Sequence, residues 1–208
     1  MNENKTLTIE PGAHIWYNDI EFVLLDITAE GDYFAVSANI TAIAAFNSKP
    51  NERPNNWEHS SLREHLNSTY LEKHFKKGHL VKTVTDMVTD YGDRTYGTCE
   101  DYITLLTCDQ RRKYFGIAPL YDSWTWTPTP WYIPTSPYAG GAVVVRLVGP
   151  SGAWSNHGAT SADGVAPACV FNHKILIPRR QAQSDQIVLE EIADEQVIYN
   201  SMFFIIDF

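Results

Sequence analysis

Aromatic and turn-forming residues are concentrated in one part of this sequence, between Tyr91 and Pro167. Four of the six tryptophans lie there, together with most of the glycines and prolines. Glycine permits left-handed turns, and proline fixes φ and removes a backbone donor, so both residues interrupt regular elements. This stretch therefore predicts ordered, aromatic-rich loops held by short strands.

The composition of the whole chain is that of a folded domain. Of 208 residues, 44% are apolar and 20% are charged, which is enough to fill a core and unlike disordered sequences. The net charge of −9 argues against binding a phosphate backbone, so we expect no nucleic-acid partner. No apolar run is long enough for a membrane span and the N-terminus lacks a secretory signal, so we expect a soluble chain made in the cytoplasm.

Alternating and apolar runs predict several short strands. A hairpin is expected from Ile20–Ile27 and Tyr33–Ser37, which flank the turn-forming residues 30–32. Further strands are expected at 102–106, 124–127, 131–133, 142–148 and 165–171.

Two capping boxes predict helix starts. Ser61 with Glu64 begins the longer helix, whose apolar face continues to Phe75, and Asn67-Ser68 is expected to break it into two helices. Thr107 with Gln110 begins a shorter helix after the strand at 102–106.

Four segments in this order resemble an uncharacterised family of bacterial and phage domains that belongs with the C-type lectin-like folds. They are NNWEHSSLREHLNSTYLEKHF, DYITLLTCDQRRKYF, WYIPTSP and GVAPACVF. The resemblance spans about residues 15–171. It implies an α+β, C-type lectin-like fold, with two helices flanking small antiparallel sheets and long loops that present a ligand surface.

The chain departs from that family at two positions. Pro134 and Ala166 stand where family members usually carry arginines, so this chain lacks both of those guanidinium groups. We expect a lectin-like domain over residues 1–173 and an extension or assembly arm over 174–208. Its apolar end, Met202–Ile206, must be buried on its own domain or on a neighbouring subunit.

Rigid aromatic side chains in the loops are the strongest functional hint, because they offer contact area at little entropic cost. Small polar residues around Trp154 are typical of a binding loop. The candidate ligand-binding residues are Tyr121, Trp124, Trp126, Trp131, Tyr132, Tyr138, Trp154, Asn156 and His157. Trp124 and Trp126 are expected on one face of a strand, although several of these rings would simply fill the core.

These features predict a non-catalytic domain that binds a glycan or a protein, with no cofactor. The family resemblance implies a virion or tail surface protein that recognises a host. The C-terminal arm, which lies outside the resemblance, is expected to carry assembly into an oligomer. One alternative is a cytosolic interaction module or inhibitor that uses the acidic residues 190–195.

The other alternative is an oxidase like the formylglycine-generating enzymes, which share the wider fold and use paired cysteines that bind copper. The closing region offers only Cys169, so this alternative is weak. The three cysteines form no CxxC pair and are expected to be reduced, without a zinc site. Carboxylates at 90–101 are of the type calcium prefers, but their spacing matches no regular calcium loop.

Overall fold

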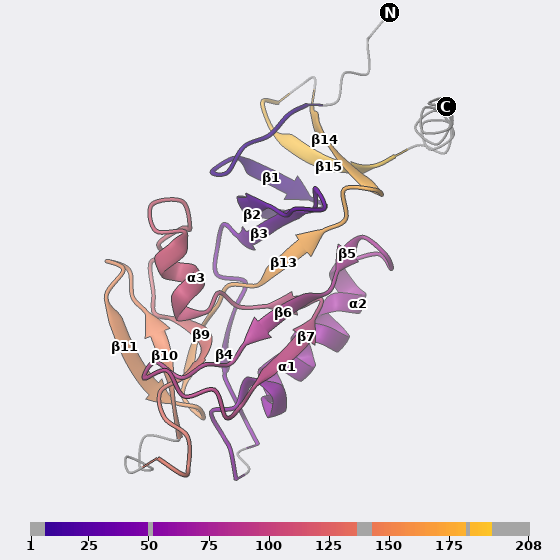
Figure 1. The fold of residues 1–208 in the computed structure, drawn as a ribbon. Helices are drawn as coiled ribbons and strands as arrows, with labels where there is room; N and C mark the ends of the chain where they lie inside the picture. The colour runs from indigo at the N-terminus through magenta and orange to yellow at the C-terminus, as the bar shows by residue number, and fades with distance from the viewer. Residues whose placement is uncertain (1–6, 50–51, 137–142, 182–183, 193–208) are drawn as a thin grey trace, which may run out of the picture.

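The computed structural model of the protein describes residues 7–49, 52–136, 143–181 and 184–192 (Figure 1). Its strands are β1 His14–Tyr17, β2 Ile20–Ile27, β3 Tyr33–Ser37, β4 Ala42–Ala45, β5 Leu80–Val81, β6 Thr83–Asp86, β7 Thr98–Asp101, β8 Ile103–Thr104, β9 Thr125–Pro130, β10 Val144–Val148, β11 Trp154–Gly158, β12 Ala162–Val165, β13 Ala168–Phe171, β14 Leu176–Arg180 and β15 Ile187–Glu191. Its helical elements are η1 Trp57–His59, α1 Ser61–His65, η2 Leu66–Tyr70, α2 Leu71–His74 and α3 Cys108–Lys113.

The fold is mostly β-structure, so the expected α+β arrangement of two helices flanking small sheets is wrong. Strands hold 38% of the described residues and helices hold 14%. The largest unit is a curled sheet of eight strands, in the order β14-β15-β1-β2-β3-β13-β5, with β8 also paired to β13. A helix begins near each predicted cap, but both helices are short. Long-range strand pairing dominates the architecture instead.

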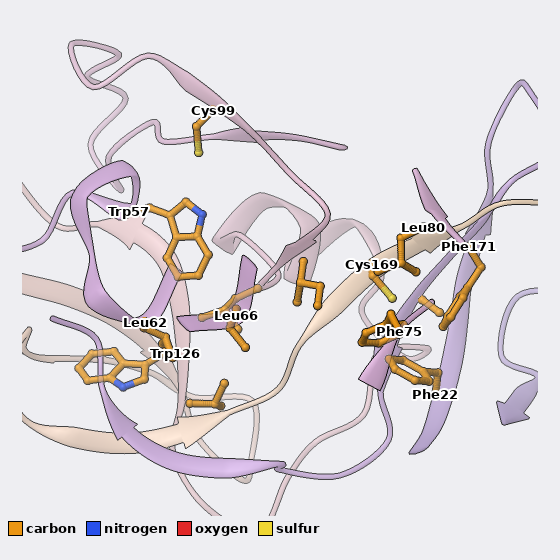
Figure 2. Packing of buried hydrophobic residues seen from close by; sticks show 14 of the residues in the cluster. Phe22, Trp57, Leu62, Leu66, Phe75, Leu80, Cys99, Trp126, Cys169 and Phe171 are labelled. Atoms are coloured by element: carbon orange, nitrogen blue, oxygen red, sulfur yellow. The ribbon is translucent and has the colours of Figure 1, made fainter. Parts of the chain in front are cut away.

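The central strands of the eight-stranded sheet, β2, β3 and β13, are buried on both faces. Along β2, Phe22 and Leu24 belong to one apolar cluster, whereas Val23 and Leu25 belong to another. Because successive side chains of a strand point to opposite faces, this alternation assigns one cluster to each face. Figure 2 shows the first cluster, in which Phe22, Phe75, Leu80 and Cys169 gather around Phe171, whereas Leu62 of α1 lies beside Trp126 at the other end.

The described part of the C-terminal extension belongs to this same sheet. β14 and β15 form an antiparallel hairpin, and β15 pairs in parallel with β1 through Ile15 and Ile187. Figure 1 shows the hairpin beside β1 at one edge of the sheet. The apolar end at 202–206 lies outside the described residues.

A second sheet of five strands has the order β11-β10-β9-β12-β4, so β11 lies at its edge. β10 pairs in antiparallel fashion with β9 and β11. β6 and β7 form a separate two-stranded sheet. This second sheet and the loops around it carry the aromatic residues singled out in the sequence.

The longer helical segment was expected to break at Asn67. It continues instead through a π-turn, η2. The Asn67 amide donates to the carbonyl oxygens of Arg63 (3.2 Å) and Ile103 (2.7 Å). Its side-chain oxygen accepts from the backbone N–H groups of Tyr102 and Ile103, each at 3.0 Å. Asn67 therefore joins the widened helical turn to the strand region beside it instead of ending the helix.

The cap of this segment lies one residue earlier than expected. Ser60, and not Ser61, accepts the hydrogen bond from the N–H of Arg63 (3.1 Å). Ser61 instead accepts from the N–H of Ser48 at 2.8 Å. The second capping box, Thr107 with Gln110, is confirmed on α3.

The hairpin of β2 and β3 is confirmed, whereas other expected strands have different bounds or are interrupted. Residues 131–133 lie outside any strand, and 102–106 contains only β8. The expected strand 165–171 divides into β12 and β13 around Pro167, which has no N–H to donate to a ladder. Within the described ranges no helix has the length and apolar character needed to cross a bilayer.

Candidate binding surface

The loop after α3 is fixed at both ends by buried tyrosines. The Tyr114 ring packs 5.8 Å from that of Phe34, and its hydroxyl donates to Asp26 (2.8 Å). The Tyr121 hydroxyl donates to the carbonyl oxygen of Ser37 at 2.7 Å. Both tyrosines belong to the cluster on the second face of the large sheet. The six residues 115–120, called the anchored loop below, are therefore held over the sheet at defined points.

Between these anchors the apolar side chains point to solvent. Phe115 is 80% exposed, Leu120 is 55% exposed and Ile117 is also exposed. Trp124, directly after the second anchor, is 36% exposed. Several large apolar side chains exposed within ten residues make a patch of the kind that marks interaction sites, whereas single exposed apolar residues are ordinary.

The anchored loop forms one wall of a groove of about 510 Å³, called the Trp154 groove below. Trp154 of β11 lies across from the loop, and Val148 of β10 also contributes. The lining residues are Arg111, Arg112, Phe115, Gly116, Ala118, Leu120, Val148, Gly152 and Trp154. Apart from the two arginines, the side chains in this lining are apolar.

The β10–β11 turn has glycines where the aromatic and aliphatic residues approach it. A Cβ on Gly149 would lie 2.8 Å from the Trp124 ring, which is closer than side-chain atoms approach each other. A Cβ on Gly152 would lie 3.7 Å from Leu120. The absence of a side chain at Gly149 thus lets the Trp124 ring rest against this turn beside the groove.

The two arginines of the groove have different partners. Arg112 contacts Asp109 (2.7 Å) and Asp90 (3.2 Å), and its guanidinium lies 5.1 Å from the centre of the Trp154 ring. Arg111 donates to the carbonyl oxygen of Pro119 at 3.0 Å and lies 5.2 Å from the Tyr121 ring. Burial raises the pKa of Tyr121, and the positive charge of Arg111 opposes that rise.

Of the predicted site residues, Trp154 lines the groove and Trp124 flanks it. Tyr121 is a buried anchor beneath it, and Trp126 is a core residue whose indole donates to the carbonyl oxygen of Ala44 (2.8 Å). Trp124 and Trp126 were expected together on a strand, but Trp124 precedes β9, which begins at Thr125, so that only Trp126 belongs to the strand.

Trp131 and Tyr132 form a second aromatic group with Tyr91, which was not predicted. The rings of Tyr91 and Tyr132 are stacked at 4.4 Å, and Trp131 lies 5.1 Å from Tyr132. Asp90, next to Tyr91 in the chain, contacts Arg112 of the groove. The ion pair between Asp90 and Arg112 thus connects the segment that carries this second group to the Trp154 groove. Tyr138 lies outside the described residues.

The predicted polar residues lie on β11, the edge strand that also carries Trp154. Asn156 is half-buried and pairs with Arg146 of β10. The exposed His157 contacts Asp163 through Nδ1 at 2.8 Å. Neither residue lines the Trp154 groove, so their contribution is to the strand and to the surface next to it.

The groups that would support catalysis or metal binding are dispersed or buried. Cys169 is 1% exposed in β13, and burial raises the pKa of its thiol, which disfavours the reactive thiolate. Asp101, one of the carboxylates considered for calcium, is buried and accepts from Arg63 (2.7 Å) and from the Trp57 indole (2.8 Å). No group of three or more potential metal ligands occurs among the residues described.

Sequence analysis missed most of the groove. Phe115, Leu120 and the two arginines were not candidates, because a short apolar run after a helix usually enters the core. One signal was available, since Gly116 and Pro119 interrupt residues 115–120 and leave them too irregular for a strand.

Comparison of the chain with family models, with curated proteins and with solved structures found no match.

Proposed function

We propose that this protein is a non-catalytic binding protein that holds a segment of another protein in the Trp154 groove. The observation that carries the proposal is the exposed apolar patch of the anchored loop. Phe115 and Leu120 stay largely in solvent although the chain has a buried core on both faces of its main sheet. Burial of such side chains against a partner would be favourable, and anchoring at Tyr114 and Tyr121 lowers the entropic cost of presenting them.

The lining of the groove favours a protein ligand over the glycan that was the other expectation. Sugar hydroxyls lose hydrogen bonds to water on binding and need donors and acceptors in return. Leu120, Val148 and Ala118 offer none from their side chains. Apolar side chains of a protein segment, by contrast, would match these walls and the face of Trp154.

Catalysis is not part of this proposal, because the described residues provide no suitable arrangement around the groove. The ionisable side chains among its described lining residues are the guanidinium groups of Arg111 and Arg112, which act neither as nucleophiles nor as bases at neutral pH. Host recognition on a virion or tail surface remains the setting that the family resemblance implies. Assembly through the C-terminal arm, residues 174–208, remains a prediction; the arm's described strands β14 and β15 pair within the chain's own sheet.

Selection from a random peptide library and binding to a glycan array test this proposal together. Peptides enriched on the wild-type protein should lose at least about tenfold in affinity when Trp154→Ala or Leu120→Ser is introduced. Ile43→Ser provides the matched control, because Ile43 is 62% exposed on β4, at the opposite edge of the five-stranded sheet from β11.

Peptides that bind all three variants equally would place the binding surface elsewhere. Glycans that bind in a Trp154-dependent manner, with no enriched peptide, would replace the protein ligand by a sugar.

A further inference from the structure

We infer that the ligand of the Trp154 groove carries a carboxylate beside an apolar side chain, and that Arg111 is the residue that receives the carboxylate. This inference rests on the proposed function and adds the chemistry of the ligand. It follows from the charge of a single side chain and its surroundings.

Arg111 is a buried cation, and no residue in the described part of the chain forms an ion pair with it. It is 7% exposed and lines the groove. Its guanidinium donates to the carbonyl oxygen of Pro119 and interacts with the ring and the hydroxyl of Tyr121. The arginine ion pairs among the described residues all involve other arginines. Its Nε is buried and has no hydrogen-bond partner there.

Other arginines of the protein show what is unusual about Arg111. Arg63 and Arg94 each contact an aspartate at 2.7 Å, although both are more exposed than Arg111. A buried charge without a counter-ion is costly, and a carbonyl dipole and an aromatic face compensate for it only in part. An anion that enters the groove would supply the missing counter-ion. A carboxylate suits this role best, because its two oxygens match the paired N–H donors of a guanidinium group.

Arg112 does not fill the same role. It already contacts Asp109 and Asp90, and its guanidinium lies over Trp154. A further carboxylate at Arg112 would have to compete with both aspartates. Arg112 therefore positions the Trp154 ring, which leaves Arg111 as the cation with capacity for a ligand.

The apolar part of the ligand follows from the remaining lining. Phe115, Leu120 and Trp154 surround a space that suits an aromatic or aliphatic side chain next to the carboxylate. The chain as a whole carries a net charge of −9, which repels anions at long range. Affinity must therefore come from contacts inside the groove, and we expect it to depend only weakly on salt.

The test compares 3-phenylpropionate with its neutral analogue 3-phenylpropionamide at pH 7, with binding followed by NMR of the tryptophan indole N–H groups. The carboxylate should bind the wild-type protein at least about tenfold more tightly, because hydrogen bonds to a charged group are the stronger kind. Arg111→Met should reduce this preference to about twofold or less, and Arg111→Lys should retain part of it because it keeps the charge. Arg94→Gln, which removes an exposed arginine outside the groove lining, is the matched control and should retain the preference.

Equal affinity of the two compounds for the wild-type protein overturns the inference, whether or not Arg111→Met folds. Full retention of the preference in folded Arg111→Met overturns it as well, and so does the absence of any shift with either compound. The library selection described above decides the proposed function separately. Two peptides then identify the source of the carboxylate: acetyl-Gly-Phe with a free C-terminus, and acetyl-Asp-Phe-amide, whose carboxylate is on a side chain.

Discussion

Replacement of Phe115 by alanine should leave the stability of the protein almost unchanged. Full burial of a phenylalanine side chain contributes about 1.5–3 kcal/mol. Phe115 is 80% exposed, so about a fifth of that value, roughly 0.3–0.6 kcal/mol, is at stake in the folded protein. Phe22→Ala is the matched comparison, because Phe22 is fully buried and its truncation should cost about 3–5 kcal/mol.

Urea unfolding followed by circular dichroism measures both values. The two variants should differ several-fold in their loss of unfolding free energy, and Phe115→Ala should keep the m-value of the wild-type protein. A loss above about 2 kcal/mol for Phe115→Ala would mean that the ring is packed in solution. The anchored loop would then be part of the core, and the argument for a free binding surface would fail.

Three further predictions concern the fold. Asn67→Ala should cost about 2–4 kcal/mol in urea unfolding, because several backbone groups around the π-turn lose their partner; a loss below about 0.5 kcal/mol would contradict this. Burial lowers the pKa of His79 in the folded protein despite the attraction of Glu191. The stability that depends on a neutral His79 is therefore fully present above its unfolded-state pKa of about 6.5 and is lost as the pH falls through the lowered folded-state pKa. His79→Gln should flatten that part of the stability profile, and an unchanged slope would refute the assignment. All three cysteines are buried, so a thiol reagent should label none of them within minutes in the native state; rapid labelling of Cys169 would reopen the thiol-enzyme alternative.

Features fixed by neighbouring residues were predictable from the sequence. The hairpin of β2 and β3 follows from two alternating runs around Gly31, and the capping box of α3 is complete within Thr107–Gln110. Features fixed by distant residues were not. The helical segment continues past Asn67 because the partners of its side chain include Ile103, which lies 36 residues away.

The candidate site shows the same limit. The sequence identified rigid aromatic residues as the functional feature, and Trp154 and Trp124 do lie at the groove. It did not reveal which rings the long-range packing would cover. Trp126 is buried because its indole reaches the carbonyl of Ala44, 82 residues earlier, whereas Phe115 is left exposed between two anchored tyrosines. Periodicity reports the character of a residue, but exposure depends on what the rest of the chain places over it.

The most direct test of the binding surface is an NMR titration of the protein, labelled at its tryptophan indoles, with a peptide selected from the library. Trp154 and Trp124, assigned by single replacements with phenylalanine, should shift as the peptide is added. The indole N–H signals should not shift for the buried Trp57 and Trp126 or for Trp16 on β1. Saturable binding that shifts Trp16 and leaves Trp154 unmoved would contradict the assignment of the groove as the ligand site.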